Sequence, residues 1–393
     1  MSALEVADIF RDHGPAWRKA HAGHISLNQL KVMSAIESCR TAQLGGHVLR
    51  CQDCGEKQIA YNSCRNRHCP KCQSSAAKRW LDARMDDLLP VDYYPVVFTL
   101  PAQIADIAYY NKAVVYNILF KAASETLLII AGDPKHLGAR IGVTMVLHTW
   151  GSTLTHHPHV HCIVPGGGFS KNSEQWVACR SGYFLTIAVL KKLFRRLFLE
   201  KLKQAHESGK LEFFGEHATL SDAQRFADWM KPLRQLNWHL YAKRPFSGPP
   251  AVLEYLSRYT HRVAIANSRI ISFNDKTVTF KYTDYKEKDD HQRKIMTLAT
   301  DEFIRRFLIH TLPKRFHRIR HYGFLANGRR VINLAHARKL LNMPPSQSSN
   351  DRVHDEEVMV STYICRSCEG PMIIIETLDP VYKSRAPPGR TAA

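Results

Sequence analysis

Four histidines between residues 156 and 161 are the side chains of this sequence best suited to metal chemistry. The run HHPHVH continues into an apolar, β-branched segment. If 159–164 forms a strand, successive side chains alternate between its faces, so His159 and His161 point the same way. Two imidazoles on one face of a rigid strand suit a divalent metal ion, although an isolated His-x-His more often holds one buried and one solvated histidine. The alternate positions are apolar and are expected to enter the core: Val160, Cys162 and Val164.

A pair of tyrosines, Tyr255 and Tyr259, is the second candidate for chemistry. The preceding FSGPP segment favours a helix start, because prolines are tolerated in the first turn. Residues four apart lie on one helical face, so both hydroxyls project from the same side. Tyrosines on a helix are usually packing residues, but Arg258 and Arg262 form a second pair at the same spacing, which suits contacts with phosphate.

Eight candidate zinc ligands lie between residues 39 and 72: Cys39, His47, Cys51, Cys54, Cys64, His68, Cys69 and Cys72. Cys51-x-x-Cys54 and Cys69-x-x-Cys72 have the spacing at which two thiolates reach one ion from a tight turn, and a second pair completes a tetrahedron. The eight ligands suffice for two closed structural sites, or for one site with ligands to spare. A chain with ten cysteines and no export signal points to metal binding in a reducing compartment.

A further Cys-x-x-Cys near the end of the chain, Cys365 and Cys368, looks like half of a zinc ribbon. It has three alternatives: a metal shared with Cys179, a metal shared with another chain, or a reduced and empty pair. A Pro- and Ser-rich linker precedes it, and the tail beyond about 381 is expected to be disordered.

The charge of the chain points to a polyanionic partner. The 393 residues include 55 basic and 35 acidic side chains, a net charge of +20. Nucleic acid is the leading candidate, with a ribosomal or membrane-surface role as alternatives. The polar amino terminus excludes a signal peptide, and polar residues interrupt the apolar run 113–131, so a cytoplasmic, nucleoid-associated protein is expected. The basic residues expected to contact DNA are Arg65, Arg67, Arg258, Arg262, Lys314, Arg315, Arg318 and Arg320.

Hydrophobic periodicity predicts an α+β protein. Helices are expected in 1–38, 74–89, 102–130, 190–198 and 302–311, strands in 96–100, 141–148, 159–164 and 238–242, and a hairpin in 264–282. We divide the chain into a small, helical zinc- and DNA-binding domain (1–90), a catalytic domain with the two-tyrosine helix (91–340), and a linker with the C-terminal tail (341–393). The basic run 314–322 interleaves aromatic residues, a composition typical of surfaces that stack bases.

These elements together suggest attack of a tyrosine on a DNA phosphate. A hydroxyl with a pKa of about 10 is a poor nucleophile at neutral pH. A divalent ion held by His159 and His161 could bind a phosphate oxygen and fix an in-line geometry. A covalent phosphotyrosine conserves the bond energy for rejoining, and two tyrosines allow strand transfer.

The combination resembles the two-tyrosine HUH transposases of rolling-circle insertion sequences. The strings that carry the resemblance are NSCRNRHCPKC (62–72), LHTWG (147–151), HHPHVH (156–161), PGGG (165–168), YAKRPF (241–246) and YLSRYTHR (255–262). It implies nicking and rejoining of single-stranded DNA through 5′-phosphotyrosines, Mg²⁺ or Mn²⁺ on the histidines, and a central antiparallel sheet with the histidines on a middle strand. No phosphate loop is present, so unwinding is expected from a host helicase.

The sequence departs from the family pattern at one position. Relatives often carry a glutamine seven residues before the first motif histidine, as a third metal ligand, and here that position is Ser152. His157 is the first candidate to replace it, and His148 and His261 are weaker ones.

Three other functions compete with this interpretation. A tyrosine recombinase would use one tyrosine without metal, beside Arg258, His261 and Arg262, and would leave a 3′-phosphotyrosine. A zinc-dependent DNA-binding protein would have no catalysis. A metallohydrolase on the histidines would form no covalent adduct.

Overall fold

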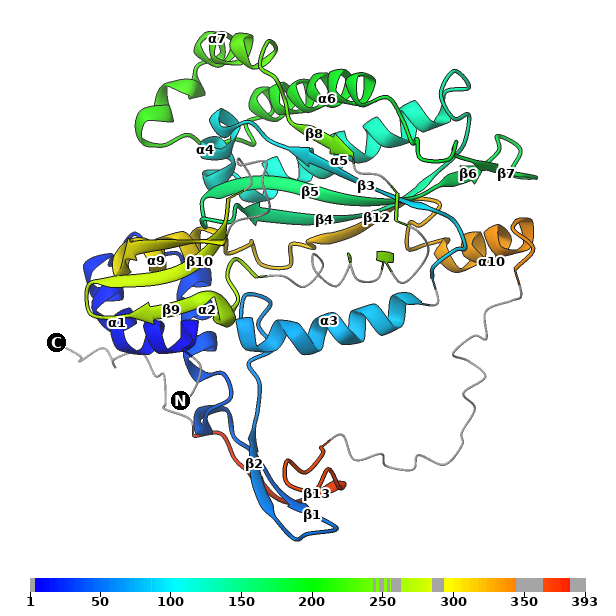
Figure 1. The fold of residues 1–393 in the computed structure, drawn as a ribbon. Helices are drawn as coiled ribbons and strands as arrows, with labels where there is room; N and C mark the ends of the chain where they lie inside the picture. The colour runs from blue at the N-terminus through cyan, green and yellow to red at the C-terminus, as the bar shows by residue number, and fades with distance from the viewer. Residues whose placement is uncertain are drawn as a thin grey trace, which may run out of the picture.

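The computed structural model describes residues 4–85, 87–242, 245–246, 251–252, 255, 263–284, 293–343 and 363–381. A five-stranded antiparallel sheet forms its centre (Figure 1). Its strands lie in the order β12 (Ile319–Gly323), β4 (Gly142–Trp150), β5 (His156–Pro165), β3 (Tyr93–Thr99) and β8 (Leu240–Ala242). β5 therefore has hydrogen-bonded neighbours on both edges, which makes it a rigid platform for the histidines.

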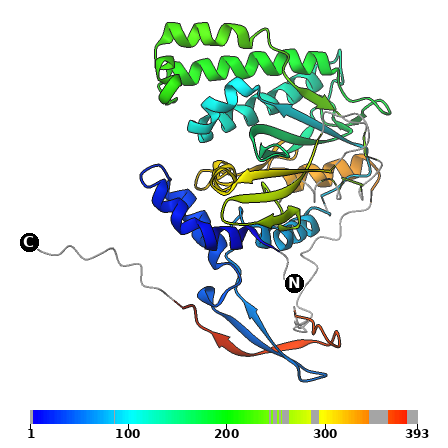
Figure 2. The same cartoon turned by 60° about the vertical axis from the view of Figure 1, so that its left-hand side comes forward.

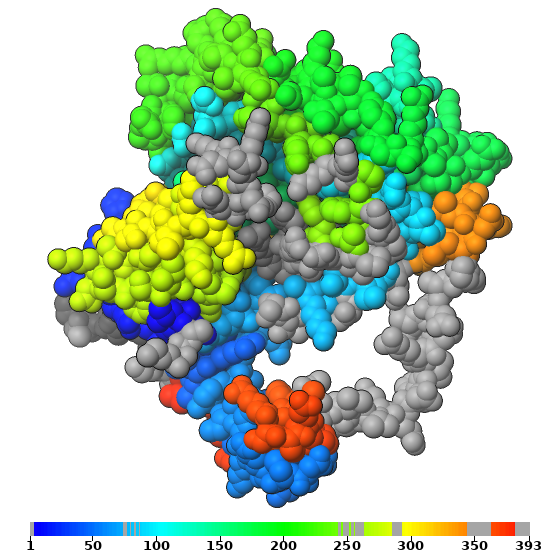
Figure 3. All heavy atoms as spheres, viewed as in Figure 1, coloured from blue at the N-terminus to red at the C-terminus, as the bar shows by residue number. Residues whose placement is uncertain are grey.

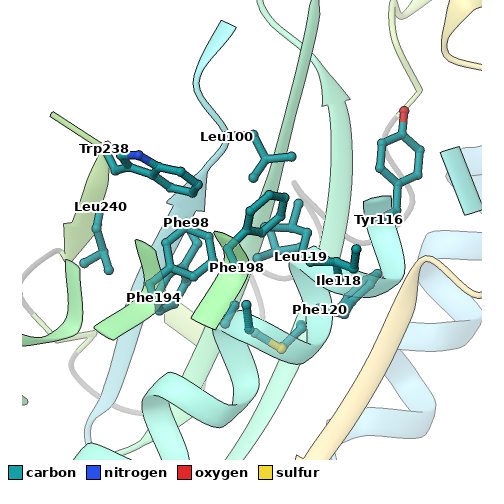
Figure 4. Packing of buried hydrophobic residues seen from close by; sticks show 14 of the residues in the cluster. Phe98, Leu100, Tyr116, Ile118, Leu119, Phe120, Phe194, Phe198, Trp238 and Leu240 are labelled. Atoms are coloured by element: carbon teal, nitrogen blue, oxygen red, sulfur yellow. The ribbon is translucent and has the colours of Figure 1, made fainter. Parts of the chain in front are cut away.

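Helices cover one face of this sheet and form the main core. They are α4 (Ala102–Tyr110), α5 (Lys112–Gly132), α6 (Ile187–Glu207) and α7 (Ala223–Leu233). Phe98 of β3 packs edge-on against Phe194 of α6 at 4.8 Å between ring centroids, and Trp238 closes the cluster 5.4 Å from Phe194 and from Phe198 (Figure 4). Burying each such side chain stabilises the fold by about 1.5–3 kcal/mol, so this face is firmly fixed.

The alternation expected for β5 is confirmed, since Val160, Cys162 and Val164 are all fully buried in this core. α5 is long and apolar enough to cross a membrane, but just over half of its apolar stretch is buried inside the fold. It packs against α6 and the sheet as a core helix does.

The other face of the sheet carries α3 (Pro70–Met85) and a second, smaller sheet. The smaller sheet has the order β11 (Arg293–Ala299), β10 (Thr277–Thr283) and β9 (Ile270–Phe273).

The N-terminal helices pack on this smaller sheet. α1 (Val6–Ala20), α2 (Leu27–Ser38) and α9 (Thr300–Ile309) share one core with it (Figure 2). The ring centroids of Phe10 in α1 and Phe307 in α9 are 5.3 Å apart, so segments distant in the sequence build this core together.

Two smaller units lie outside these layers. The ribbon of β6 (Gly167–Phe169) and β7 (Trp176–Ala178) packs near α10 (Arg330–Leu340). A sheet in the order β13 (Met372–Leu378), β1 (Gly46–Cys51) and β2 (Lys57–Tyr61) projects away from the body (Figures 1 and 2).

The predicted α+β class is confirmed, and the four predicted central strands coincide with β3, β4, β5 and β8. The segment 314–322 was expected to be a basic surface run, but its second half is the edge strand β12. The zinc region, expected to be helical, also contains the β1–β2 hairpin. The predicted helix over 102–130 is two helices that meet at Asn111.

Candidate active site

Three histidines from two neighbouring strands converge on the face of the central sheet opposite the helices α4–α7. His159 and His161 project from β5, and the β4–β5 register places His148 directly opposite His159. One ring nitrogen from each lies within 4.8 Å of the others, and we call this group the histidine cluster. The Nε2 atoms of His159 and His161 are 3.1 Å apart. Two nitrogens bound to one ion at about 2.1 Å lie roughly 3.0–3.4 Å apart, so the cluster fits a metal ion.

Hydrogen bonds and burial prepare His159 for metal binding. Its Nδ1 lies 2.7 Å from the carbonyl oxygen of His157, which can only accept, so Nδ1 carries the proton and Nε2 keeps its lone pair. Burial lowers the pKa of His159 to about 4. The ring is therefore neutral at physiological pH, the form that binds a metal ion.

Tyr255 reaches the same site from the segment expected to be the two-tyrosine helix. Its backbone is helical, and its ring packs 4.9 Å from that of Phe246. Its hydroxyl oxygen lies 3.0 Å from Nδ1 of His161. The partner residues of the expected helix face, Tyr259, Arg258 and Arg262, lie outside the described residues, as does His261.

A large cavity lies in front of the histidines, between the central sheet and the β9–β11 sheet. Its volume is about 1050 Å³, at the upper end of the range of small-molecule pockets. Its wall includes all three members of the histidine cluster and the basic side chains of Arg269, Lys281 and Arg293. Arg269 also holds the two sheets together, because its guanidinium donates to the carbonyls of Ser152 at 2.5 Å and of Lys281 at 2.7 Å.

This geometry favours one of the candidates for a third metal ligand over the others. His148 is 3% exposed and belongs to the histidine cluster, whereas the exposed His157 does not and contacts His159 through its carbonyl. Ser152 lines the cavity wall. His148 ranked low on sequence alone because it precedes the motif by eleven positions. The pairing of two predicted antiparallel strands is the signal that could have raised it.

Two groups of four cysteines bring thiols together elsewhere in the chain. The first thiol cluster is Cys39, Cys64, Cys69 and Cys72, and the second thiol cluster is Cys51, Cys54, Cys365 and Cys368. In the first, the sulfur of Cys72 lies 3.5 Å from that of Cys39 and 3.6 Å from that of Cys64. Four thiolates at about 2.3 Å from a tetrahedral zinc ion lie about 3.8 Å apart, so this group fits zinc.

The grouping corrects the sequence interpretation in two respects. The N-terminal Cys-x-x-Cys pairs do not close one tetrahedron, because each belongs to a different cluster. Neither His47 nor His68 joins a cluster. Nε2 of His68 instead accepts a hydrogen bond from the backbone N–H of Leu312 at 3.3 Å, and burial lowers the pKa of His68 to about 3. The buried Nδ1 of His47 has no hydrogen-bond partner among the described residues.

Comparison with known proteins identifies the family. The family described as "Putative transposase" matches residues 142–331, and the "Transposase zinc-binding domain" matches residues 9–100. The chain is 53% identical over 389 residues to "Putative transposase y4qJ" of Sinorhizobium fredii (strain NBRC 101917 / NGR234), across 97% of both chains. It is also 26% identical over 305 residues to "Transposase for insertion sequence element IS801" of Pseudomonas savastanoi pv. phaseolicola, covering 76% of this chain and 70% of that protein.

The chain belongs to the IS91/IS801 family of transposases. The resemblance read from its motifs is confirmed. As a transposase it is a DNA-cleaving enzyme, and DNA is its partner. Zinc is supported by the zinc-binding family domain together with the cysteine clusters.

The described basic residues that were expected to contact DNA fall into two groups: those held by contacts within the protein, and those exposed to solvent. Arg67 donates to the carbonyl of Phe316 and, at 2.6 Å, to that of Pro313. Arg318, only 8% exposed, donates to Gln73 at 2.6 Å. These contacts fasten the segment of the first thiol cluster and the start of α3 to residues 313–318, which lead into β12.

Arg320 is held in a similar way. It lies over the ring of Phe120 at 4.2 Å and donates to Asn117 at 2.7 Å. The remaining described candidates, Arg65, Lys314 and Arg315, are exposed.

Proposed function

We propose that this transposase cleaves and rejoins single-stranded DNA through a 5′-phosphotyrosine on Tyr255, beside a divalent ion on the histidine cluster. The observation that carries the proposal is the position of the Tyr255 hydroxyl, 3.0 Å from Nδ1 of His161, on a ring whose Nε2 faces His159. Nucleophile and metal-ligand candidates thus meet at one imidazole.

His148, His159 and His161 would hold Mg²⁺ or Mn²⁺, which supplies Lewis-acid polarisation of the scissile phosphate. With Nε2 of His161 used as a ligand, its Nδ1 carries the proton and donates it to the Tyr255 oxygen in a hydrogen bond. That bond orients the hydroxyl and stabilises negative charge developing on the oxygen during attack. The histidine acts as a positioning donor.

The covalent step is balanced within the substrate and the tyrosine. The Tyr255 oxygen forms a bond to phosphorus, and the bond from phosphorus to the 3′ oxygen breaks. The phenolic proton is lost and the departing 3′ oxygen gains one. Attack by an incoming 3′ hydroxyl reverses the step and joins a new strand, with Tyr259 proposed as the second nucleophile from its spacing in the sequence.

The DNA path follows from the cavity and its charges. Arg269, Lys281 and Arg293 lie on the wall opposite the histidines, where they can neutralise the backbone of a strand entering the cavity. A DNA duplex is much wider than a single strand and would fit this cavity less well. A single strand is therefore the favoured substrate. Strand separation is assigned to a host helicase.

An end-labelled single-stranded oligonucleotide that carries the element end tests the proposal with Mn²⁺ on a denaturing gel. We expect a labelled protein adduct from the 3′-labelled strand and only a shorter free fragment from the 5′-labelled strand. EDTA should abolish both products, and Tyr255→Phe should reduce the adduct. A labelled adduct from the 5′-labelled strand would instead indicate recombinase chemistry, and cleavage without any adduct would indicate a metallohydrolase.

A further inference from the structure

The second thiol cluster joins two parts of the chain that lie 311 to 317 positions apart. We propose that Cys51, Cys54, Cys365 and Cys368 hold a second structural zinc ion, which locks the C-terminal segment onto the N-terminal region. Half of this ligand set lies beyond residues 9–100, where the family zinc-binding domain matches. The proposal does not depend on the mechanism proposed for the histidines.

The four sulfurs have the separations of metal ligands. The sulfur of Cys51 lies 3.5 Å from that of Cys368, and the sulfur of Cys54 lies 3.6 Å from that of Cys365. All four lie within 4.8 Å of one another. These distances approach the roughly 3.8 Å of a tetrahedral zinc tetrathiolate and far exceed the roughly 2.05 Å of a disulfide.

Both Cys-x-x-Cys segments have the same backbone conformation. The N–H of Cys51 donates to the carbonyl of Glu56, five residues on, at 2.9 Å, and the N–H of Cys365 donates to that of Gly370, also five residues on, at 2.9 Å. The fourth residue after the first cysteine has a positive φ in each segment, +74° at Gly55 and +59° at Glu369. Glu369 adopts this conformation without the freedom of glycine, at a cost of about 1–3 kcal/mol. Two such turns face each other and present their four thiols inward.

The two turns are fitted to each other closely. The N–H of Gln52 donates to the carbonyl of Pro371 at 3.0 Å. A Cβ atom on Gly370 would lie only 2.1 Å from a carboxylate oxygen of Asp53, so a larger residue there would have to displace the Asp53 side chain. Glu56 also accepts a hydrogen bond from the hydroxyl of Ser367. These contacts lie around the thiols on several sides and indicate a built site.

Apolar burial alone cannot hold this sheet together. β13 pairs with β1 from Gly46 to Cys51, and the two strands share a small core whose fully buried members are Leu49, Cys51, Cys365 and Met372. Figure 3 shows this part of the chain as a knob below the body, formed by N-terminal and C-terminal residues. A core of this size is far below what a metal-free unit of this kind needs, and small domains commonly use a metal instead. Zinc binding displaces the four thiol protons to solvent and supplies the missing stability.

The donor set selects the kind of ion. Four thiolates in a tetrahedron suit zinc, while Mg²⁺ and Mn²⁺ prefer oxygen ligands. The second thiol cluster is therefore a closed structural site, chemically distinct from the histidine cluster.

Zinc stoichiometry of the purified full-length protein tests the proposal. To keep the histidines from adding to the count, each variant is made in a His159→Ala, His161→Ala background. We expect two zinc ions per chain in this background, and one after Cys365→Ser and Cys368→Ser. The control is Cys179→Ser, which removes a half-buried thiol outside both clusters and should leave two. An unchanged count of two in the Cys365, Cys368 double variant overturns the proposal.

A second measurement keeps the proposal testable if that double variant does not fold. A protease site is inserted between residues 350 and 351 of the otherwise unaltered chain, and the protein is cut after purification. The C-terminal fragment should remain bound on gel filtration and be released by a strong zinc chelator, with one zinc ion set free. A fragment that leaves while both ions stay with the body overturns the assignment.

Discussion

The first thiol cluster and the histidine cluster each gather metal-binding side chains, but their surroundings are opposite. The thiol cluster has four ligands, and three of them are buried in the core shared by α1, α2 and α9. The histidine cluster has three ligands and faces a cavity of about 1050 Å³. Structural zinc sites are closed, and catalytic metal sites keep a position for substrate. Zinc in the first region would hold the fold, whereas in the proposed mechanism a metal ion in the second would contact the DNA phosphate.

The largest effect is expected when the closed cluster is opened. Cys64→Ser removes one of four ligands from a site whose zinc contributes on the order of 10 kcal/mol in zinc-finger peptides. A whole domain is typically stable by only about 5–15 kcal/mol, so we expect loss of one zinc ion and of cooperative unfolding. Circular dichroism melting and metal analysis measure both. Cys179→Ser is the control, and a Cys64→Ser protein with unchanged zinc and melting would refute the closed-site interpretation.

Opening the histidine cluster should affect catalysis and leave the fold intact. We expect His148→Ala to slow adduct formation by at least about 100-fold, because loss of an outer partner alone costs a metal site 10- to 100-fold. His157→Ala keeps the backbone carbonyl that orients His159 and should stay within a few-fold of the parent. Adduct yield against Mn²⁺ concentration is the measurement. Equal losses in the two variants, or a loss confined to His157→Ala, would reverse the choice of third ligand.

The buried Arg318 and the exposed Arg315 offer the same comparison between an enclosed and an open group. Arg318→Ala removes a buried charged donor from Gln73, and hydrogen bonds to charged groups are worth about 1.5–3 kcal/mol. We expect a loss of that size in the free energy of unfolding measured in urea. Arg315→Ala, at an exposed position, should change it by less than about 0.5 kcal/mol. Equal stability of both variants would show that the contact between Arg318 and Gln73 does not help to hold α3 to the segment before β12.

The smallest effects are expected at the exposed basic residues. Replacing Arg65, Lys314 and Arg315 with Gln should reduce the slope of log affinity against log salt by up to about 2, near 0.7 for each phosphate contact on a single strand. The control replaces three basic residues of α6 on the far face of the sheet, Lys192, Arg196 and Lys203. Fluorescence anisotropy at several salt concentrations measures both sets. An identical slope for both would remove these side chains from the DNA path.

The sequence predicted the features that depend on neighbouring residues along one strand or helix. Alternation along one strand was enough to place His159 and His161 on one face, and Val160 in the core. Periodicity likewise located the central strands, because a strand with one apolar face must bury it.

Contacts between residues far apart in the sequence could not be predicted from these local patterns. His148 joins the site only through the register of β4 on β5, and Cys365 meets Cys54 across 311 positions. Charge alone also did not predict the contacts of Arg67 and Arg318 within the protein, because an arginine bound to carbonyls or amides looks the same in the sequence as one that binds phosphate.

Because β13 pairs with β1, the sheet can be completed only after most of the chain has been synthesised. A ribosome adds roughly 5–20 residues per second, so the 317 positions that separate Cys51 from Cys368 take on the order of 15–60 s to make. Throughout that interval the edge of β1 has no strand to cover it, and an uncovered edge is a template for pairing with another chain. Nascent chains on neighbouring ribosomes of one message are thus exposed to cross-pairing, and a chain that ends early never leaves that state.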